Sequence, residues 1–516
     1  MVWQSEIDEL QHRKHLAMQM GGPKGVERQH SRGKLTVRER IEALADPGSF
    51  KEAGILVGRP TYEDDRLVAF TPANSVQGRC TIDGRSVVIN GGDFTVRGGA
   101  ADGGMSKGNM VGLALEWRLP YIRLLDASGG SVRTFEQIGR TYIPDANAWE
   151  LPAIRLLGIA PVVSAVMGSV AGLPAIEACL SHFSLMVKET SQIFAGGPPV
   201  VKAALGYDVT KEELGDYRIQ VHQGGVIDNV AENEEEAFSI IKRFLSYMPS
   251  NVWEMPPRIE PTDAPERRDD KLLSIIPRNR KRGYDPYQIL KCVLDHDSIF
   301  EISPFFGQSR ITALARVNGY PVGVMINNPL HLGGSMDVAA GQKVIRFLQL
   351  CDTFHLPMVY FADEPGFMVG LEAQRQGISR AGARVVTATC LTKMPWITFI
   401  IRQLYGVAGQ NHNRPGGMFQ RVAWPSANWG SMHIEGGTAA AYRREIEAAP
   451  DSEAKRQEFE GRLQAIASPF RTAEAGGVEE IIDPRETRPI LCDFVEMAQI
   501  TIKTQLGPIT GPGFWS

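Results

Sequence analysis

Two short runs of small residues, each following an apolar segment, are the clearest candidates for chemistry in this sequence. In the first, the β-branched run 161–167 ends at Gly168, and small residues lead from Ser169 to Gly172. A helix that Pro174 can begin follows. A strand that passes into a helix in this way leaves backbone N–H groups without partners, and such groups can stabilise a negative charge on a carbonyl oxygen. For this stretch taken alone, a tight turn that needs small residues only for packing is an open alternative.

A second run of this kind, 405–409, occurs at a matched place in the chain. Asp126 precedes Gly172 by 46 residues, and Asp363 precedes Ala408 by 45. Each of the two Asp residues ends an apolar segment that begins after a proline. Ordered elements at repeated spacing predict two related α/β domains of about 230 residues, each offering one such turn.

The familiar side-chain motifs for catalysis are missing. The sequence contains no GxSxG nucleophile elbow, no GxxxxGK[ST] phosphate loop, no GxGxxG after a strand, and no HxH, HExxH or CxxC spacing. We therefore expect no nucleotide hydrolysis, no dinucleotide and no metal. Four of the ten histidines lie near the candidate turns, although a single histidine is more often structural: His182, His331, His412 and His433. Catalysis by backbone N–H groups is the remaining possibility, and it suits the enolate chemistry of thioesters.

Composition excludes several classes of protein. A formal net charge of −4 over 516 residues argues against a nucleic-acid binder. No apolar run approaches the roughly 20 residues that cross a bilayer. The N-terminal segment carries acidic residues and lacks an apolar core, so we expect neither a signal nor a transit peptide and place the protein in the cytoplasm. The six cysteines are far apart, which argues against a disulfide framework.

Local signals predict the elements that position these turns. Thr36 and Glu39 form a capping box for a helix that ends near Leu44. The Asp-Gly pair at 83–84 predicts a hairpin. The apolar segment 121–125 predicts a strand.

A loop containing Gly129 and Gly130 follows that strand, at the edge of the sheet where ligands bind in α/β folds. Arg32, Lys34 and Arg38 are candidates for contacts with phosphate, although such charges more often form a solvated face.

The clearest domain boundary is the segment 248–283, which is dense in proline and charge. We interpret it as a connector between an N-terminal domain, 1–247, and a C-terminal domain, 284–516.

From Gly33 to about Ile500 the chain resembles the carboxyltransferase (β) subunits of biotin-dependent acyl-CoA carboxylases, within the crotonase superfamily. The motifs that carry the resemblance are RGKLTVRERIEALADPGSF, GGDFTV, LLDASGG, VMGSVAG, AGGPPVVKAALG, NNP, FLQLCDTFHLPMVYFADEPGFMVG and LYGVAG. The resemblance implies an α/β fold of two tandem crotonase-like (ββα spiral) domains related by internal duplication.

It also implies the roles of the two turns. The thioester oxygen of an acyl-CoA would accept from the N–H groups of Gly172 and Leu173, and the ureido oxygen of biotin from those of Val407 and Ala408. Carbon dioxide would pass from carboxybiotin to the enolate of the acyl-CoA, without a side-chain base. We expect further substrate contacts from Gly129, Gly130, Ala171, Gly406, Gly409 and Gln410.

The partners follow from the same resemblance. The chain has no Met-Lys-Met biotin-attachment motif and no ATP-binding segment, so biotin would be carried on a partner that contains biotin carboxylase and biotin carrier. Coenzyme A would enter as part of the substrate. Members usually form hexamers, as trimers of dimers, with each site built between the N-terminal domain of one chain and the C-terminal domain of another.

Two departures from the family pattern bear on the substrate. Leu173 and Pro174 follow Ala171-Gly172, where members usually have a second glycine. The second turn, 406–410, is closer to methylcrotonyl-CoA carboxylases than to propionyl-CoA carboxylases, which favours a branched, unsaturated or bulkier acyl group. Two alternatives stay open: a decarboxylase subunit that works in the reverse direction, and a scaffold that has lost turnover.

Overall fold

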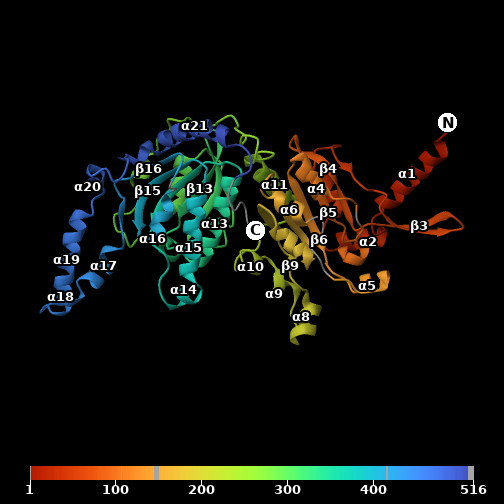
Figure 1. Ribbon diagram of the computed structural model, residues 1–516, viewed down its shortest axis with the longest axis horizontal. Helices are drawn as coiled ribbons and strands as arrows, with labels where there is room; N and C mark the ends of the chain where they lie inside the picture. Colours follow the sequence, from red (N-terminus) through yellow and green to blue (C-terminus); the bar gives the residue numbers. More distant parts are fainter. Residues whose placement is uncertain (1, 106, 144–149, 414–415, 510–516) are drawn as a thin grey trace. The chain divides into compact units, whose positions relative to one another are not determined.

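The chain folds into two compact units, of which the first ends at Glu254 and the second begins at Met255. The computed structural model (Figure 1) describes residues 2–105, 107–143, 150–413 and 416–509. Residues 255–283, within the segment that we expected to connect the domains, are part of the second unit, and Leu272 is buried in its core.

The first unit is built on one eight-stranded sheet with the order β1-β4-β5-β6-β7-β8-β10, and β9 also pairs with β7. The pairs β1/β4 and β4/β5 are antiparallel, and the others are parallel. The strands are β1 (Lys51–Glu52), β4 (Ser75–Ile82), β5 (Arg85–Gly92), β6 (Tyr121–Ala127), β7 (Val162–Ala171), β8 (Phe183–Val187), β9 (Gln192–Phe194) and β10 (Asn229–Ala231).

The second unit repeats this sheet with the order β11-β12-β13-β14-β15-β16-β18, and β17 pairs with β15. Antiparallel and parallel pairs fall at the same places as in the first sheet. The strands are β11 (Phe300–Glu301), β12 (Arg310–Val317), β13 (Tyr320–Asn327), β14 (Met358–Glu364), β15 (Trp396–Tyr405), β16 (Phe419–Ala423), β17 (Asn428–Gly430) and β18 (Glu480–Ile481). Both the α/β class and the duplicated order of elements are therefore confirmed.

The strand register corrects one detail of the predicted repeat. Val170 pairs with Ile193 of β9, and Leu404 pairs with Trp429 of β17. Gly172 is therefore equivalent to Gly406 and not to Ala408, which the residue count had matched to it. The count was misleading because Asp363 and Gly406 are only 43 residues apart, so the connection between the two strands is three residues shorter in the second unit.

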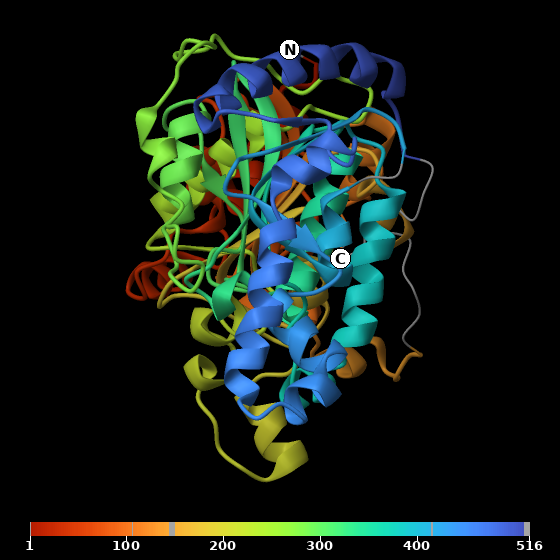
Figure 2. The same cartoon turned by 90° about the vertical axis from the view of Figure 1, so that its left-hand side faces the viewer.

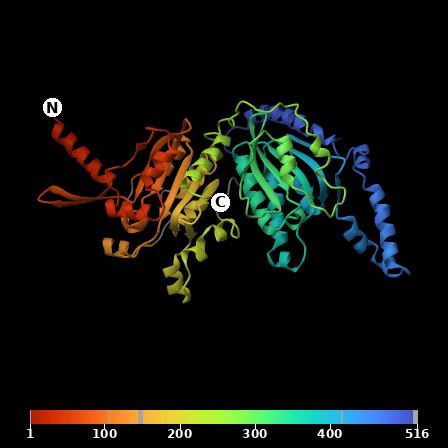
Figure 3. The ribbon, with the colours of Figure 1, turned by 180° about the vertical axis from the view of Figure 1, so that it is seen from behind.

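Helices cover the sheet of the first unit, with α3 and α11 packed together over β4, β5 and β8. The capping box of Thr36 and Glu39 is present at α3, and β4 and β5 form the predicted hairpin. Outside the sheet, α1 and a hairpin of β2 (Gly58–Glu63) and β3 (Arg66–Pro72) pack against each other (Figure 3). The helices are α1 (Gln4–Met18), α2 (Pro23–His30), α3 (Val37–Leu44), α4 (Met110–Trp117), α5 (Arg133–Ile138), α6 (Glu150–Leu156), α7 (Leu173–Cys179), α8 (Pro198–Leu205), α9 (Lys211–Gly215), α10 (Tyr217–Gln220) and α11 (Glu234–Tyr247).

Helices cover both faces of the second sheet. The side chains of α12 and α21 share one buried core with Val322 and Val324 of β13. Gly323, between these two valines, faces the opposite side, where a Cβ would lie 2.4 Å from Sγ of Cys351 on α13. Figure 2 shows α21 along the top of this unit. The helices are α12 (Pro286–Val293), α13 (Val338–Thr353), α14 (Leu371–Arg375), α15 (Ile378–Leu391), α16 (Gly406–Gly409), α17 (Ile434–Ala441), α18 (Arg443–Glu447), α19 (Ser452–Ile466), α20 (Pro469–Glu474) and α21 (Thr487–Gln505).

Candidate active site

The turn of the first unit lies between β7 and α7. Gly172 has φ = 68°, a backbone conformation that favours glycine, and its amide donates to the carbonyl of Phe194 on β9 at 3.3 Å. The amide of Leu173 has no acceptor among the residues that the structure describes, and Pro174 has no N–H group. The turn therefore offers one free amide, that of Leu173.

The glycine loop after β6 packs directly against this turn. A Cβ at Gly129 would lie 2.3 Å from the carbonyl oxygen of Ala171, so only glycine allows this approach. The amide nitrogen of Gly130 lies 3.9 Å from the position that a Cβ on Gly172 would take. Gly129, Gly130, Ala171 and Gly172 thus meet at the carboxyl end of β6 and β7.

The turn of the second unit has the same form. Gly406 has φ = 62°, and the amides of Val407 and Ala408 have no acceptor within the described part of the chain. Val407 is 56% exposed, whereas Ala408 and Gly409 are buried. Gln410 follows on the surface. This turn therefore offers two free amides beside an exposed apolar side chain.

Two histidines support the second turn. Nδ1 of His412 lies 2.5 Å from the carbonyl oxygen of Gly409, and burial lowers the pKa of this imidazole to about 4. The ring of His433 lies 4.1 Å from that of Tyr405, and its Nε2 is 2.8 Å from the carbonyl oxygen of Pro365. Each of the two imidazole rings contacts a residue of the turn, His412 the carbonyl of Gly409 and His433 the ring of Tyr405. These contacts fit a structural role for both histidines.

The other two histidines near the turns differ from each other. His182 is buried, accepts from the amide of Val162 and contacts the carbonyl of Leu157 at 2.8 Å, so it is a structural residue. His331 is exposed.

A hollow of about 580 Å³ in the first unit is strongly cationic. Of its charged side chains only the buried carboxylate of Asp102 is acidic, and Arg97 contacts it at 2.9 Å. The hollow includes Gly98, whose Cβ position lies 3.7 Å from Oγ of Ser128, next to the glycine loop. The cationic side chains are those of Arg28, Arg32, Arg97, Arg133 and Lys211.

Of the three cations that the sequence offered for phosphate, only Arg32 lines this hollow. Lys34 contacts Asp126 at 2.8 Å, and Arg38 contacts Glu52 at 2.8 Å. Sequence reasoning missed Arg28, and it missed Arg97, Arg133 and Lys211 because these three come from separate segments and no spacing relates them.

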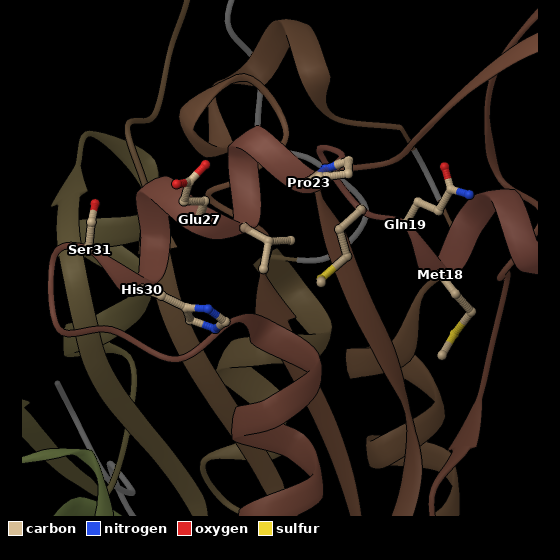
Figure 4. A pocket seen from close by; sticks show the side chains of 8 residues that line it. Met18, Gln19, Pro23, Glu27, His30 and Ser31 are labelled. Carbon is tan, nitrogen blue, oxygen red and sulfur yellow. The ribbon is translucent and has the colours of Figure 1, made fainter.

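A second hollow of the first unit has a different character. It has a volume of about 710 Å³ between α1 and α2 (Figure 4). Its two titratable side chains are Glu27 and His30, and the ring of His30 lies 2.9 Å from Glu39. Most of the remaining lining is apolar, from Met18, Met20, Pro23 and Val26. It does not offer the charges that a polyanion requires.

Neither a membrane-spanning helix nor a cluster of metal ligands occurs among the residues that the structure describes. No helix there is long and apolar enough to span a membrane. No group of three or more His, Cys, Asp or Glu side chains is arranged to hold a metal ion.

Residues 28–505 match the model of the carboxyl transferase domain. The chain belongs to the carboxyl transferase family. The carboxyltransferase subunit of propionyl-CoA carboxylase from Haloferax mediterranei is 33% identical, with 98% of each chain covered. The α subunit of methylmalonyl-CoA decarboxylase from Veillonella parvula is also 33% identical, with 96% of each chain covered.

A solved structure extends the likeness to the fold. The crystal structure of the transcarboxylase 12S subunit, a hexamer with methylmalonyl-CoA and methylmalonic acid bound, matches this carboxyl transferase with a TM-score of 0.87 at 31% identity. The match covers 99% of this chain and 98% of the other. The predicted family, the crotonase-like fold and the assignment as an enzyme subunit of the carboxyltransferase type are confirmed.

Proposed function

We propose that this carboxyltransferase component of a biotin-dependent acyl-CoA carboxylase binds its two reactants at the two equivalent turns. The first turn would bind the thioester oxygen of an acyl-CoA, through the amide of Leu173 beside Gly172. The second would bind the ureido oxygen of biotin, through the amides of Val407 and Ala408. The observation that carries the proposal is that the same turn, with a positive-φ glycine and free amides after it, occurs in both units.

The free amides suit this chemistry. Removing the α proton of a thioester places negative charge on its carbonyl oxygen, and an amide already fixed beside that oxygen stabilises the charge without reorganisation. When bound, carboxybiotin would supply the carbon dioxide and, through its ureido group, the base that takes the α proton. Such a site needs no side-chain base, and the chain's contribution is to orient the two oxygens and to stabilise the charge on the substrate.

The cationic hollow of the first unit is our candidate for the phosphates of coenzyme A. Arginine binds phosphate oxygens through paired N–H groups, and this hollow offers four arginines and a lysine against one carboxylate. It adjoins the loop of Gly129 and Gly130, which contacts the turn. A ligand with phosphates in the hollow could therefore extend along one edge of the sheet to the amide of Leu173.

The acyl group is restricted by the side chain of Leu173. This leucine stands where family members usually have glycine, and 44% of its surface is exposed. It narrows the space beside the thioester, while the second turn favours a branched, unsaturated or bulkier acyl group, and we propose an acyl-CoA of that kind as the substrate.

The remaining partners complete the proposal. Biotin would be carried on a protein that contains biotin carboxylase and biotin carrier, and the chain itself would assemble as a trimer of dimers. Six chains of 56.7 kDa would give a particle of about 340 kDa. We also propose a cytoplasmic location.

A decarboxylase subunit is the second candidate. The likeness to the methylmalonyl-CoA decarboxylase subunit favours it, because the same two turns would serve the reaction in the opposite direction.

The test is to purify the full chain with its biotin-containing partner and to assay a panel of acetyl-, propionyl- and methylcrotonyl-CoA. Carboxylation that depends on ATP and bicarbonate supports the leading proposal. Release of carbon dioxide from a carboxyacyl-CoA without ATP supports the decarboxylase. No turnover with a fully biotinylated partner would indicate a scaffold and contradict both.

A further inference from the structure

Each unit contains a fully buried aspartate close to its turn, Asp126 in β6 and Asp363 in β14, both with no exposed surface. The sequence had marked them only as the ends of two matching strands. The proposed function does not use them, because neither is exposed to a ligand. Their hydrogen bonds indicate a different role for these two carboxylates.

Each aspartate lies opposite an irregularity in the next strand. In the first unit Leu125 pairs with Val166 and Ala127 with Val170, so three residues of β7 stand against Asp126 alone. In the second, Ala362 pairs with Ile400 and Glu364 with Leu404, so three residues of β15 stand against Asp363. We call these three-residue segments, 167–169 and 401–403, the bulges. Each bulge ends three residues before the positive-φ glycine of the turn.

In the second unit the aspartate binds the bulge directly. Oδ1 of Asp363 accepts from the amide and from Nε2 of Gln403, both at 3.2 Å. Arg402, also in the bulge, donates to both carboxylate oxygens at 3.0 Å. The hydroxyl of Tyr284 donates to Oδ2 at 2.9 Å. The carboxylate thus satisfies the bulge amide that the broken strand pairing leaves without a partner.

In the first unit an arginine from another element makes the link. Oδ2 of Asp126 accepts from Arg40 of α3 at 3.1 Å, and Nη2 of Arg40 donates to the carbonyl of Met167, in the bulge, at 3.0 Å. The bulge position equivalent to Arg402 is Gly168, where a Cβ would lie 2.0 Å from Oδ1 of Asp126. The two units therefore reach the same arrangement, a buried Asp–Arg pair on the bulge, with the arginine supplied from different places.

The carboxylate of Asp126 also connects the turn to the cationic hollow. It accepts from Nε2 of Gln29 at 3.1 Å and from Nζ of Lys34 at 2.8 Å. Gln29 belongs to α2, which carries Arg28 in the wall of the hollow.

We propose that Asp126 and Asp363 are positioning residues that fix the bulge in the strand leading to each turn, and thereby fix the direction of the amides that follow. This inference rests on the proposed function for its kinetic consequences only. A displacement of about 1 Å in a catalytic group can lower turnover by about a hundredfold, so a loosened bulge has a large effect on rate.

The test compares Asp363→Asn and Asp126→Asn with matched controls in the complete enzyme. Asparagine keeps the size of the side chain but lacks the charge and the second acceptor oxygen. Asp352→Asn and Asp228→Asn are the controls. Both residues are buried and bind backbone amides, of Lys393 and Ser184 respectively, at places away from the turns.

The first measurement is hydrogen exchange, which needs no activity. We expect Asp363→Asn to speed the exchange of the hydrogen-bonded amides within 403–405 by about tenfold or more, and Asp126→Asn that of the bonded amides within 169–172, while neither control does so. Exchange in these segments that matches the controls would overturn the inference. Should the wild type fail to carboxylate any acyl-CoA, the proposed function fails and this measurement still decides the positioning role.

The second measurement is steady-state kinetics in an active enzyme. Asp126→Asn should raise KM for acyl-CoA and lower kcat, because it disturbs both α2 and the first turn. Asp363→Asn should lower kcat by about tenfold or more with KM for acyl-CoA unchanged. A purely structural role would instead lower the yield of folded enzyme and leave both constants near those of the controls.

Discussion

At the scale of single residues, the first turn depends on a backbone group and not on the side chain that carries it. Leu173 stands where the family resemblance led us to expect a glycine, but its amide is the one that lacks an acceptor in the described structure, since that of Gly172 donates to Phe194. A leucine therefore preserves the hydrogen-bond donor that the proposed chemistry needs and changes only the space around it.

The first prediction separates this donor from the side chain. Leu173→Pro removes the N–H group at the first helical position, where proline fits, and we expect kcat to fall by about 10²- to 10³-fold. Leu173→Gly keeps the amide, and its kcat should stay near that of the wild type while bulkier acyl-CoA substrates are accepted. A folded proline variant with normal kcat would rule out this amide as the donor.

His412 predicts a pH dependence of stability. Burial, with a contribution from Arg421, lowers the pKa of its imidazole to about 4, against about 6.5 in an unfolded chain. Between these values the unfolded chain binds more protons, so the stabilisation is complete above pH 6.5 and is lost as the pH falls towards 4. The loss should reach about 2–3 kcal/mol.

The measurement for His412 is urea unfolding between pH 4 and 8. His412→Gln cannot titrate in this range, so its unfolding free energy should depend less steeply on pH below 6.5. The same slope in both proteins would show that other groups govern the acid sensitivity.

At the scale of elements, the sequence predicted those features that depend on residues close together in the chain. The capping box of Thr36 and Glu39 and the hairpin at 83–84 involve neighbours in the chain, and both were confirmed. The prediction that Ala408 corresponds to Gly172 was wrong, because residue spacing along the chain cannot reveal that one connection between strands is shorter than the other. Only the strand register shows that Gly172 matches Gly406.

The cationic hollow could not be predicted from the sequence for a related reason. Its side chains come from α2, from the segment around Arg97, from α5 and from α9, and only the folded sheet brings them together. The buried aspartates were visible as strand ends, but their arginine partners were not, since Arg40 lies 86 residues from Asp126.

The hollow gives a prediction at this scale. Arg133→Ala removes one cation from it, and we expect KM for acyl-CoA to rise by about tenfold, the effect of losing one charge-assisted hydrogen bond. An acyl thioester of N-acetylcysteamine, which lacks phosphates, should be used equally well by the variant and the wild type. Arg66→Ala, an exposed arginine of β3, is the matched control. An unchanged KM for acyl-CoA would place the phosphates elsewhere.

At the scale of the whole molecule, duplication would account for the proposed binding of two reactants. Two copies of one sheet give two copies of one turn, and under the proposed function each copy binds its own ligand. The first keeps a single free amide beside a cationic hollow, whereas the second has two free amides and an exposed valine. The proposed chemistry requires one turn of each kind.

The family resemblance implies that they come from different chains, and complementation tests this. Leu173→Pro removes the free amide of the first turn, and Val407→Pro removes one of the two free amides of the second, so we expect each variant alone to lose most of its activity. When both are co-expressed, a mixed dimer whose sites combine units from different chains contains one site with two intact turns. With random pairing about a quarter of wild-type activity should return. If each site used the two units of one chain, every site would contain a damaged turn and co-expression would restore nothing.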